Sequence, residues 1–128
     1  MLQINHIQTV EDAYFYARDV IKGRWIEGEP IIATNPEYAY CYARDVIDGR
    51  WVKCEAIIAT NPKCSYYYAF DVIKGRFPEG EATIATDPAW AYRYARDIIK
   101  GRWLEGELHI LFSENATEYA KLCGMTFD

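Results

Sequence analysis

A repeat of 26 residues constrains this chain more than any other feature of its sequence. Gly-Arg pairs stand at 23–24, 49–50, 75–76 and 101–102, always the same distance apart. The phrase AYxYARDVIxGRW, or a close variant of it, leads into each pair. A unit of this length cannot bury an apolar face alone, so neighbouring units must stack. The sequence therefore predicts an architecture in which each unit contacts mainly its neighbours.

Each unit carries signals for the start and end of a helix. Asn35-Pro36 and its equivalents in the next two units pair a good N-cap with proline at the first helical position. Thr9 is the weaker cap of the first unit. Gly49 and its equivalents are of the residue type favoured just past a helix end. We expect a first helix of about 13 residues in every unit.

The second half of each unit, RWIEGEPIIAT in the first one, is more ambiguous. Ile31 and Ile32 would suit a short strand, and Gly28 is a poor helix former. In the third unit, however, Pro78 followed by Glu79 looks like the start of a helix. A short α-helix is the favoured interpretation, and a hairpin-like or 3₁₀ segment stays open as the alternative.

These signals predict an all-α fold, a short α-solenoid of four 26-residue helix-pair repeats plus a C-terminal capping helix. A chain of 128 residues suffices for one domain and is short for two. We expect a single repeat domain, 1–128, with repeats at about 9–34, 35–60, 61–86 and 87–111 and a cap at 112–128.

The first helix of each unit should bury one stripe. In the second unit Ala39, Ala43, Val46 and Ile47 share a face at 100° per residue, and the tyrosines on either side of position 41 flank it. Small residues in the middle of the stripe would let a neighbouring helix approach closely. Position 41 points away from the stripe and varies between units, as a solvent-facing position would.

The phrase AYxYARDVIKGRW, followed by E-x-E and another capped AYxYA helix, resembles a short tandem repeat of uncharacterised bacteriophage and large-DNA-virus proteins. It is also similar to other helix-pair repeats of about this length. The likeness covers residues 9–111. This chain departs from the common form at Gly28, Gly80 and Gly106, where alanine would be the better helix residue. The resemblance implies a viral origin and a binding or scaffolding role.

Three charged positions are the same in all four units: an Asp in the first helix, an Arg after it and a Glu in the second segment. The two middle units supply the structural-ladder residues Asp45, Arg50, Glu55, Asp71, Arg76 and Glu81. These charges could line a binding groove. The favoured interpretation is structural: each Arg bridges the Asp and the Glu of its own unit, because bidentate geometry requires arginine and no unit substitutes lysine.

The outward face of the first helices supplies the candidate interaction residues. An exposed Trp90 beside Arg93 would be a suitable anchor for a protein partner. The paired tyrosine columns could line an aromatic groove, although filling of the core is the favoured interpretation. The candidate interaction residues are Tyr38, Arg44, Tyr67, Trp90, Arg93 and Arg96.

Enzymatic and cofactor chemistry is not indicated. The two His and four Cys share no metal-ligand spacing. Ser65 and Ser113 are the only serines, and neither lies near a His in the repeat frame. Cys41 and Cys64 fall on adjacent first helices, close enough to consider a disulfide, although accidental proximity is favoured and free thiols suit a reducing compartment. We expect no catalytic residue, no metal and no cofactor.

The charge pattern bears on the partner. A net charge of −5 disfavours a general nucleic-acid binder. The second segments carry seven Glu against Lys53 alone, and the first helices are more basic toward the C-terminal half. Such two-faced electrostatics favour a protein partner or side-by-side self-association into a homo-oligomer. The chain has neither a membrane-spanning run nor an export leader, so a cytoplasmic location, in the host if the protein is viral, is expected.

The sequence as a whole predicts a non-enzymatic protein-interaction or scaffolding module. Two other functions stay open. One is an acidic nucleic-acid mimic that inhibits a host defence enzyme. The other is a small-molecule or nucleotide sponge that uses tyrosine and arginine side chains at an oligomer seam.

Overall fold

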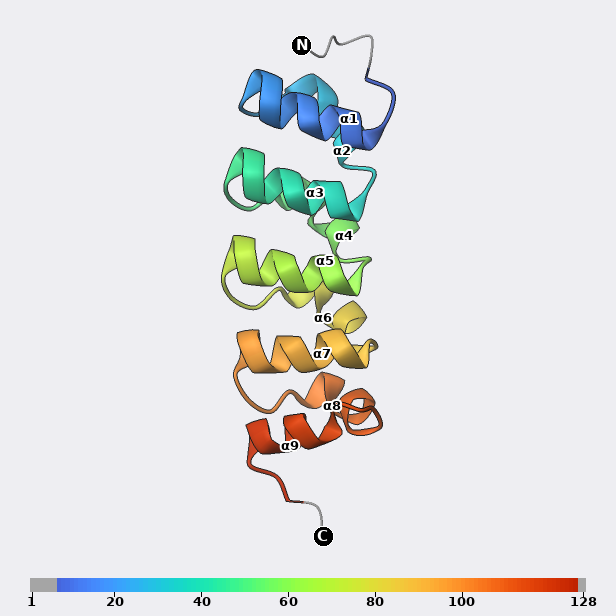
Figure 1. Ribbon diagram of the computed structural model, residues 1–128, viewed down its shortest axis with the longest axis vertical. Coiled ribbons are helices and arrows are strands. Elements are labelled where there is room, and N and C mark those ends of the chain that lie inside the picture. The colour runs from blue at the N-terminus through green and yellow to red at the C-terminus, as the bar shows by residue number, and fades with distance from the viewer. Residues whose placement is uncertain (1–6, 127–128) are drawn as a thin grey trace.

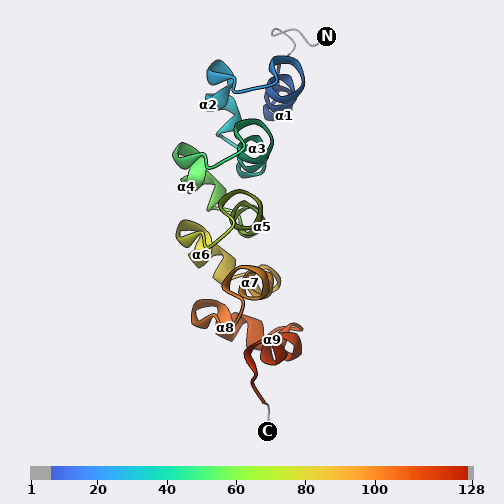
Figure 2. The same ribbon diagram turned by 90° about the vertical axis from the view of Figure 1, so that its left-hand side faces the viewer.

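The computed structural model describes residues 7–126, and these residues contain helices and no strands. The all-α prediction is therefore confirmed. Figures 1 and 2 show an elongated stack of layers, with the first helices of the units in one column and the second segments in another. Residues 1–6 and 127–128, which the predicted domain includes, lie outside the described residues.

The first helix of each unit begins as an α-helix and ends as a π-helix. The pairs are α1 (Val10–Phe15) with η2 (Tyr16–Ile21), α3 (Pro36–Tyr42) with η4 (Ala43–Ile47), α5 (Pro62–Tyr67) with η6 (Tyr68–Ile73), and α7 (Pro88–Tyr94) with η7 (Ala95–Ile99). The predicted caps are present: Asn35 Oδ1 accepts the backbone N–H groups of Glu37 and Tyr38, and Thr9, Asn61 and Asp87 act alike. The π-helical ending was not expected from the sequence.

The helix ends differ from the prediction by one residue. The left-handed residue is the one before each glycine, with φ between 58 and 62°: Lys22, Asp48, Lys74 and Lys100. Gly49 and its equivalents follow that residue, and a Cβ at any of them would meet open space. A side chain at φ near +60° costs roughly 1–2 kcal/mol, so each helix end holds a strained residue.

The second segments are helical, as the favoured interpretation predicted. They consist of η3 (Ile26–Gly28) with α2 (Glu29–Ile32), η5 (Val52–Cys54) with α4 (Glu55–Ile58), α6 (Pro78–Ala85) and α8 (Leu104–Leu111). The 3₁₀ alternative applies to the first turn in the first two units, where η3 and η5 precede the α-helix. The capping helix α9 (Ala116–Cys123) closes the stack.

In three units a glycine of the second segment makes room for close packing, so it is not a departure that alanine would improve; the second unit has Cys54 at this position. A Cβ at Gly80 would lie 2.6 Å from Ser65 Oγ and 2.7 Å from the ring of Phe77. A Cβ at Gly28 would lie 2.0 Å from Trp25. The glycine lets the aromatic residue at the corner of the unit lie flat on the second segment, which explains its presence despite poor helix propensity.

The core is built from equivalent positions of each unit. Its largest fully buried side chains include Tyr42, Tyr68, Tyr94, Tyr119, Ile32, Ile58, Ile84 and Ile110. Of the predicted stripe, Ala39 and Ala43 are fully buried, whereas Val46 and Ile47 are partly buried and pack against the core. The expectation that position 41 faces solvent is wrong for three units, because Phe15, Cys41 and Tyr67 are partly buried and pack against the same core; only Arg93 is exposed.

Candidate functional site

The structure pairs each ladder arginine with the glutamate of its own unit. Arg50 Nε and Nη2 donate to the two Glu55 oxygens at 2.8 Å, and Arg76 binds Glu81 in the same way. Glu55 is 4% exposed, and the Arg50 guanidinium holds the pKa of its carboxyl below the ordinary value. The predicted second bond, from each arginine to the Asp of its own helix, is not formed, and that Asp binds other side chains instead.

A tyrosine of the following unit completes each Arg–Glu pair. The Tyr68 hydroxyl donates to Glu55 at 2.6 Å and accepts the backbone N–H of Trp51 at 2.9 Å. The same arrangement recurs around Tyr42, Tyr94 and Tyr119. The tyrosines of this network are buried, whereas the arginines remain about half exposed. Because the network joins one layer to the next, it serves the stack and leaves the Arg–Glu pairs nearly neutral. Sequence reasoning missed the tyrosine because it belongs to a different unit.

The ladder aspartates also connect neighbouring layers. Tyr14 donates to Asp45 at 2.5 Å, and Tyr66 donates to Asp97 at the same distance, each across one layer boundary. Arg44 Nε and Nη2 hold Asp45 at 2.7 and 2.8 Å. Tyr40 donates to Asp71 likewise. In the third unit, however, Phe70 replaces the arginine that precedes the Asp elsewhere, so Asp71 has no arginine from its own helix.

The predicted interaction residues lie along the column of first helices, where they contact one another or neighbouring side chains. Trp90 is partly buried rather than exposed: its ring centroid lies 5.4 Å from that of Tyr66 and 5.6 Å from that of Tyr67. The Arg93 guanidinium lies 4.6 Å from the Trp90 ring centroid. Trp90 therefore packs between layers. Only part of its ring surface is exposed for a partner to contact.

The remaining predicted residues have partners too. Tyr38 packs on Tyr14 with ring centroids 5.6 Å apart. Arg96 is paired with Asp97 at 2.8 Å. Besides its bonds to the adjacent aspartate, Arg44 donates from Nη1 to the hydroxyl of Tyr40 at 2.9 Å. These side chains are held in place by intramolecular contacts, which lowers their freedom to reorganise around a partner.

Sequence reasoning missed an apolar ridge on the second segments. Ile26, Val52, Pro78 and Leu104 occupy the same position of the four units, directly after the buried corner aromatic, and all four are exposed. Their exposed fractions are 62% for Ile26, 69% for Val52 and 70% for Leu104. The sequence did carry a signal for this ridge, because the position is apolar in all four units. The second segment there buries its opposite side, so the recurring apolar residue is not needed for the core. We call these four residues the apolar ridge.

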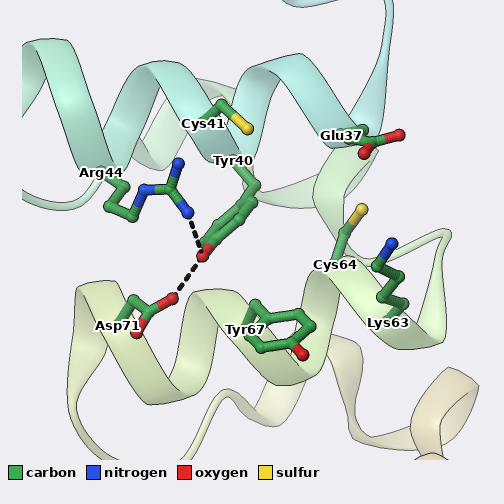
Figure 3. Close-up of a pocket in the computed structure, with 8 residues that line it drawn as sticks. All are labelled: Glu37, Tyr40, Cys41, Arg44, Lys63, Cys64, Tyr67 and Asp71. Carbon is green, nitrogen blue, oxygen red and sulfur yellow. Dashed lines mark hydrogen bonds between the residues drawn. The ribbon is translucent and has the colours of Figure 1, made fainter.

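Two of the hollows on the stack bear on function. One of about 370 Å³ lies beside the ridge, lined by Ile26, Glu29, Pro30, Ala33, Trp51, Lys53 and Cys54. The other, of about 310 Å³, lies between α3 and α5, lined by Glu37, Tyr40, Cys41, Arg44, Lys63, Cys64, Tyr67 and Asp71 (Figure 3). Burial raises the pKa of the Cys64 thiol to about 11, so this thiol is protonated near neutral pH and is a poor nucleophile.

Metal ligands, thiols and membrane spans can be assessed in the part of the chain that the structure describes. No group of three or more His, Cys, Asp or Glu side chains within residues 7–126 is placed to hold a metal ion. Cys41 and Cys64 are both free thiols. No helix of the described residues is both long and apolar enough to cross a membrane.

Comparisons of the chain with protein-family models, with curated proteins and with solved structures gave no match. The resemblance to viral tandem repeats therefore stays a prediction.

Proposed function

We propose that the chain is a non-enzymatic protein-interaction module and that the apolar ridge is its contact surface. The observation that carries the proposal is the recurrence of an exposed aliphatic residue or proline at one position of all four units. One exposed aliphatic side chain on a protein surface needs no explanation. A column of them in register is different, because it repeats an exposed apolar side chain in every layer at a position that the core does not use.

The spacing of the ridge favours an extended partner segment. Packed helices lie about 8–10 Å apart, so successive ridge residues are separated by about one such layer. A polyproline II segment rises roughly 3.1 Å per residue with three residues per turn, or about 9.3 Å per turn. A segment with an apolar side chain at every third position would therefore present one such side chain to each layer. Such a segment also loses little entropy on binding, because it is extended beforehand.

The charges beside the ridge favour a basic segment. Glu29, Glu55 and their equivalents are each held by an arginine. The charges left free of such pairs are Glu27, Glu79 and Glu105 against Lys53, and all four are exposed. This surplus of negative charge complements lysine or arginine placed between the apolar side chains of the partner.

The nucleic-acid mimic draws less support from this geometry. Four of the seven glutamates of the second segments are paired with arginine, which removes the dense negative array that mimicry of phosphates needs. The partner we propose is therefore a protein segment.

Fluorescence anisotropy with a labelled peptide of repeating Leu-Pro-Lys, long enough to span four layers, tests the proposal. Val52→Ser and Leu104→Ser should each weaken binding by about tenfold, because each removes an aliphatic contact worth roughly 1.5 kcal/mol. Phe70→Ser is the matched control, since Phe70 is 48% exposed but belongs to a first helix. A peptide of repeating Leu-Pro-Pro-Lys, which breaks the three-residue spacing, should bind weakly.

Two results would overturn the proposal. The first is the absence of peptide binding, or binding that is equal in the ridge variants, the Phe70→Ser control and the peptide with altered spacing. The second comes from sedimentation velocity. Association of the protein with itself that disappears in Val52→Ser would assign the ridge to a second copy of the chain rather than to an extended partner.

A further inference from the structure

The hollow between α3 and α5 has its origin in a local break of the repeat. Three positions meet at each junction between neighbouring first helices. They are occupied by Tyr14, Phe15 and Tyr38 at the first junction, by Tyr40, Cys41 and Cys64 at the second, and by Tyr66, Tyr67 and Trp90 at the third. Of these three junctions, the second alone has two small side chains in place of two aromatic rings.

The first and third junctions show what this space holds when it is filled. At the third junction the Tyr66 and Tyr67 ring centroids lie 5.0 Å apart, and Trp90 lies 5.4 and 5.6 Å from them. At the first junction, Phe15 and Tyr38 lie 5.2 and 5.6 Å from Tyr14. These distances fall in the range of favourable aromatic pairs. The fold therefore holds aromatic clusters at the equivalent sites on either side of the second junction.

At the second junction the cysteines leave this volume open. A thiol side chain is much smaller than a phenol or indole, and the hollow there measures about 310 Å³. Tyr40 and Tyr67 remain, with ring centroids 6.1 Å apart. Burial raises the pKa of both thiols, so Cys41 and Cys64 present neutral, polarisable sulfur to whatever enters.

The rim of the hollow is charged and partly fixed (Figure 3). The Tyr40 hydroxyl is held between Arg44 and Asp71, so the orientation of this ring is set. Glu37 and Lys63 line the same hollow from the N-terminal parts of α3 and α5. Both signs of charge therefore surround an opening whose inner lining is tyrosine and cysteine.

We propose that this hollow is a binding site for a single planar aromatic ring. The ring would take the place that Phe15 and Tyr38, or Tyr67 and Trp90, occupy at the other junctions, and its polar substituents would meet the charges of the rim. The ring belongs either to a free aromatic amino acid or to an aromatic side chain of a polypeptide. The site lies among the first helices, away from the apolar ridge, so the inference stands independently of the proposed function.

The test titrates the ¹⁵N-labelled protein separately with indole, free L-tryptophan and N-acetyltryptophanamide. Amide chemical shifts measured by NMR report the binding of each probe. Saturable shifts at residues lining the hollow are expected, with a dissociation constant on the order of 1 mM for indole, because an open hollow desolvates only part of the ring. The double variant Cys41→Tyr, Cys64→Trp copies the third junction and should abolish these shifts while raising the melting temperature.

Matched variants separate filling of the hollow from loss of the thiols. Cys41→Ala with Cys64→Ala keeps the space open and should bind indole within about threefold of the unaltered protein, a difference below 1 kcal/mol. Should the double aromatic variant misfold, Cys41→Phe alone restores the ring that Phe15 supplies at the first junction and should weaken indole binding at least tenfold. Val52→Ser, on the ridge, should leave indole binding unchanged.

The outcomes are distinct. Tighter binding of free tryptophan than of N-acetyltryptophanamide supports a free amino acid as the source of the ring, and equal binding supports a side chain of a polypeptide. Absence of shifts with all three probes overturns the proposal. So do shifts that persist unchanged in a folded Cys41→Phe variant.

Discussion

Replacing Tyr68 by Phe tests whether the buried bonds between layers hold this stack together. The variant keeps the ring and removes only the hydroxyl, which serves two buried groups at once. It accepts the Trp51 backbone N–H at 2.9 Å and donates to Glu55 at 2.6 Å. Tyr68 is fully buried and Glu55 is 4% exposed, so water cannot replace the lost bonds without rearrangement.

The expected loss follows from these two groups. An unsatisfied buried N–H costs roughly 1–3 kcal/mol, and a lost hydrogen bond to a carboxylate costs roughly 1.5–3 kcal/mol. Glu55 keeps its two hydrogen bonds to Arg50, so the cost of losing its bond to the tyrosine hydroxyl lies at the lower end of the carboxylate range. We expect the free energy of unfolding to fall by about 3 kcal/mol, which is about 10 °C in melting temperature for a chain of this size.

Urea denaturation followed by far-UV circular dichroism measures this change. Tyr67→Phe is the matched control, because the neighbouring Tyr67 is partly exposed and its hydroxyl makes no hydrogen bond to any other described residue. The control should change the unfolding free energy by less than about 0.5 kcal/mol. Equal stability of the two variants would refute the assignment of the network as the main polar contact between layers.

Four further predictions concern pH, packing and backbone strain. Arg50 lowers the pKa of Glu55, so the ionised Glu55 carboxylate stabilises the folded protein above the ordinary pKa of 4.5. This contribution to the unfolding free energy, measured by urea titration, should be lost as the pH falls from 4.5 through the lowered pKa. The pKa of Tyr14 is raised to about 12 by burial and its carboxylate partner, so stability should also fall as the pH rises from 10 toward 12. Gly80→Ala should lower the melting temperature by several degrees, a loss of roughly 1–3 kcal/mol in unfolding free energy, because a Cβ at this position has no room. Cys54→Ala, at the equivalent position of the second unit, should lower the melting temperature less. An equal effect of the two variants would argue against the steric explanation. Lys74→Gly should raise the unfolding free energy by about 0.5–1 kcal/mol in the same denaturation assay, because glycine adopts the left-handed backbone of this residue without strain. A loss of stability would count against backbone strain at Lys74.

Much of the fold was predictable because its determinants are local and recur. Asn35-Pro36 places an N-cap before a helix whatever the rest of the chain does, and the side chain of Asn35 does accept the expected backbone N–H groups. The period of 26 residues predicted the stack, because a single unit has nowhere else to bury its alanine stripe. The burial of Ala39 and Ala43 likewise follows from helical geometry alone.

The offset between layers was decided only by the tertiary structure. The sequence shows which positions recur, but it does not say which position of one unit faces which position of the next. The ladder arginine was therefore expected to bind the Asp of its own unit, whereas Tyr14 reaches Asp45 across 31 residues and Tyr68 reaches back to Glu55 across 13.

The same offset determines where the candidate sites lie. Cys41 and Cys64 occupy different positions of their units, and only the packing of α3 on α5 brings both to one hollow. Gly80 has poor helix propensity, and only the packing of Phe77 against it explains why glycine stands there. Local propensity and periodicity act within one unit and are legible in the sequence. Contacts between units depend on the relative translation and rotation of two packed surfaces, which side-chain shape determines only once the layers have come together.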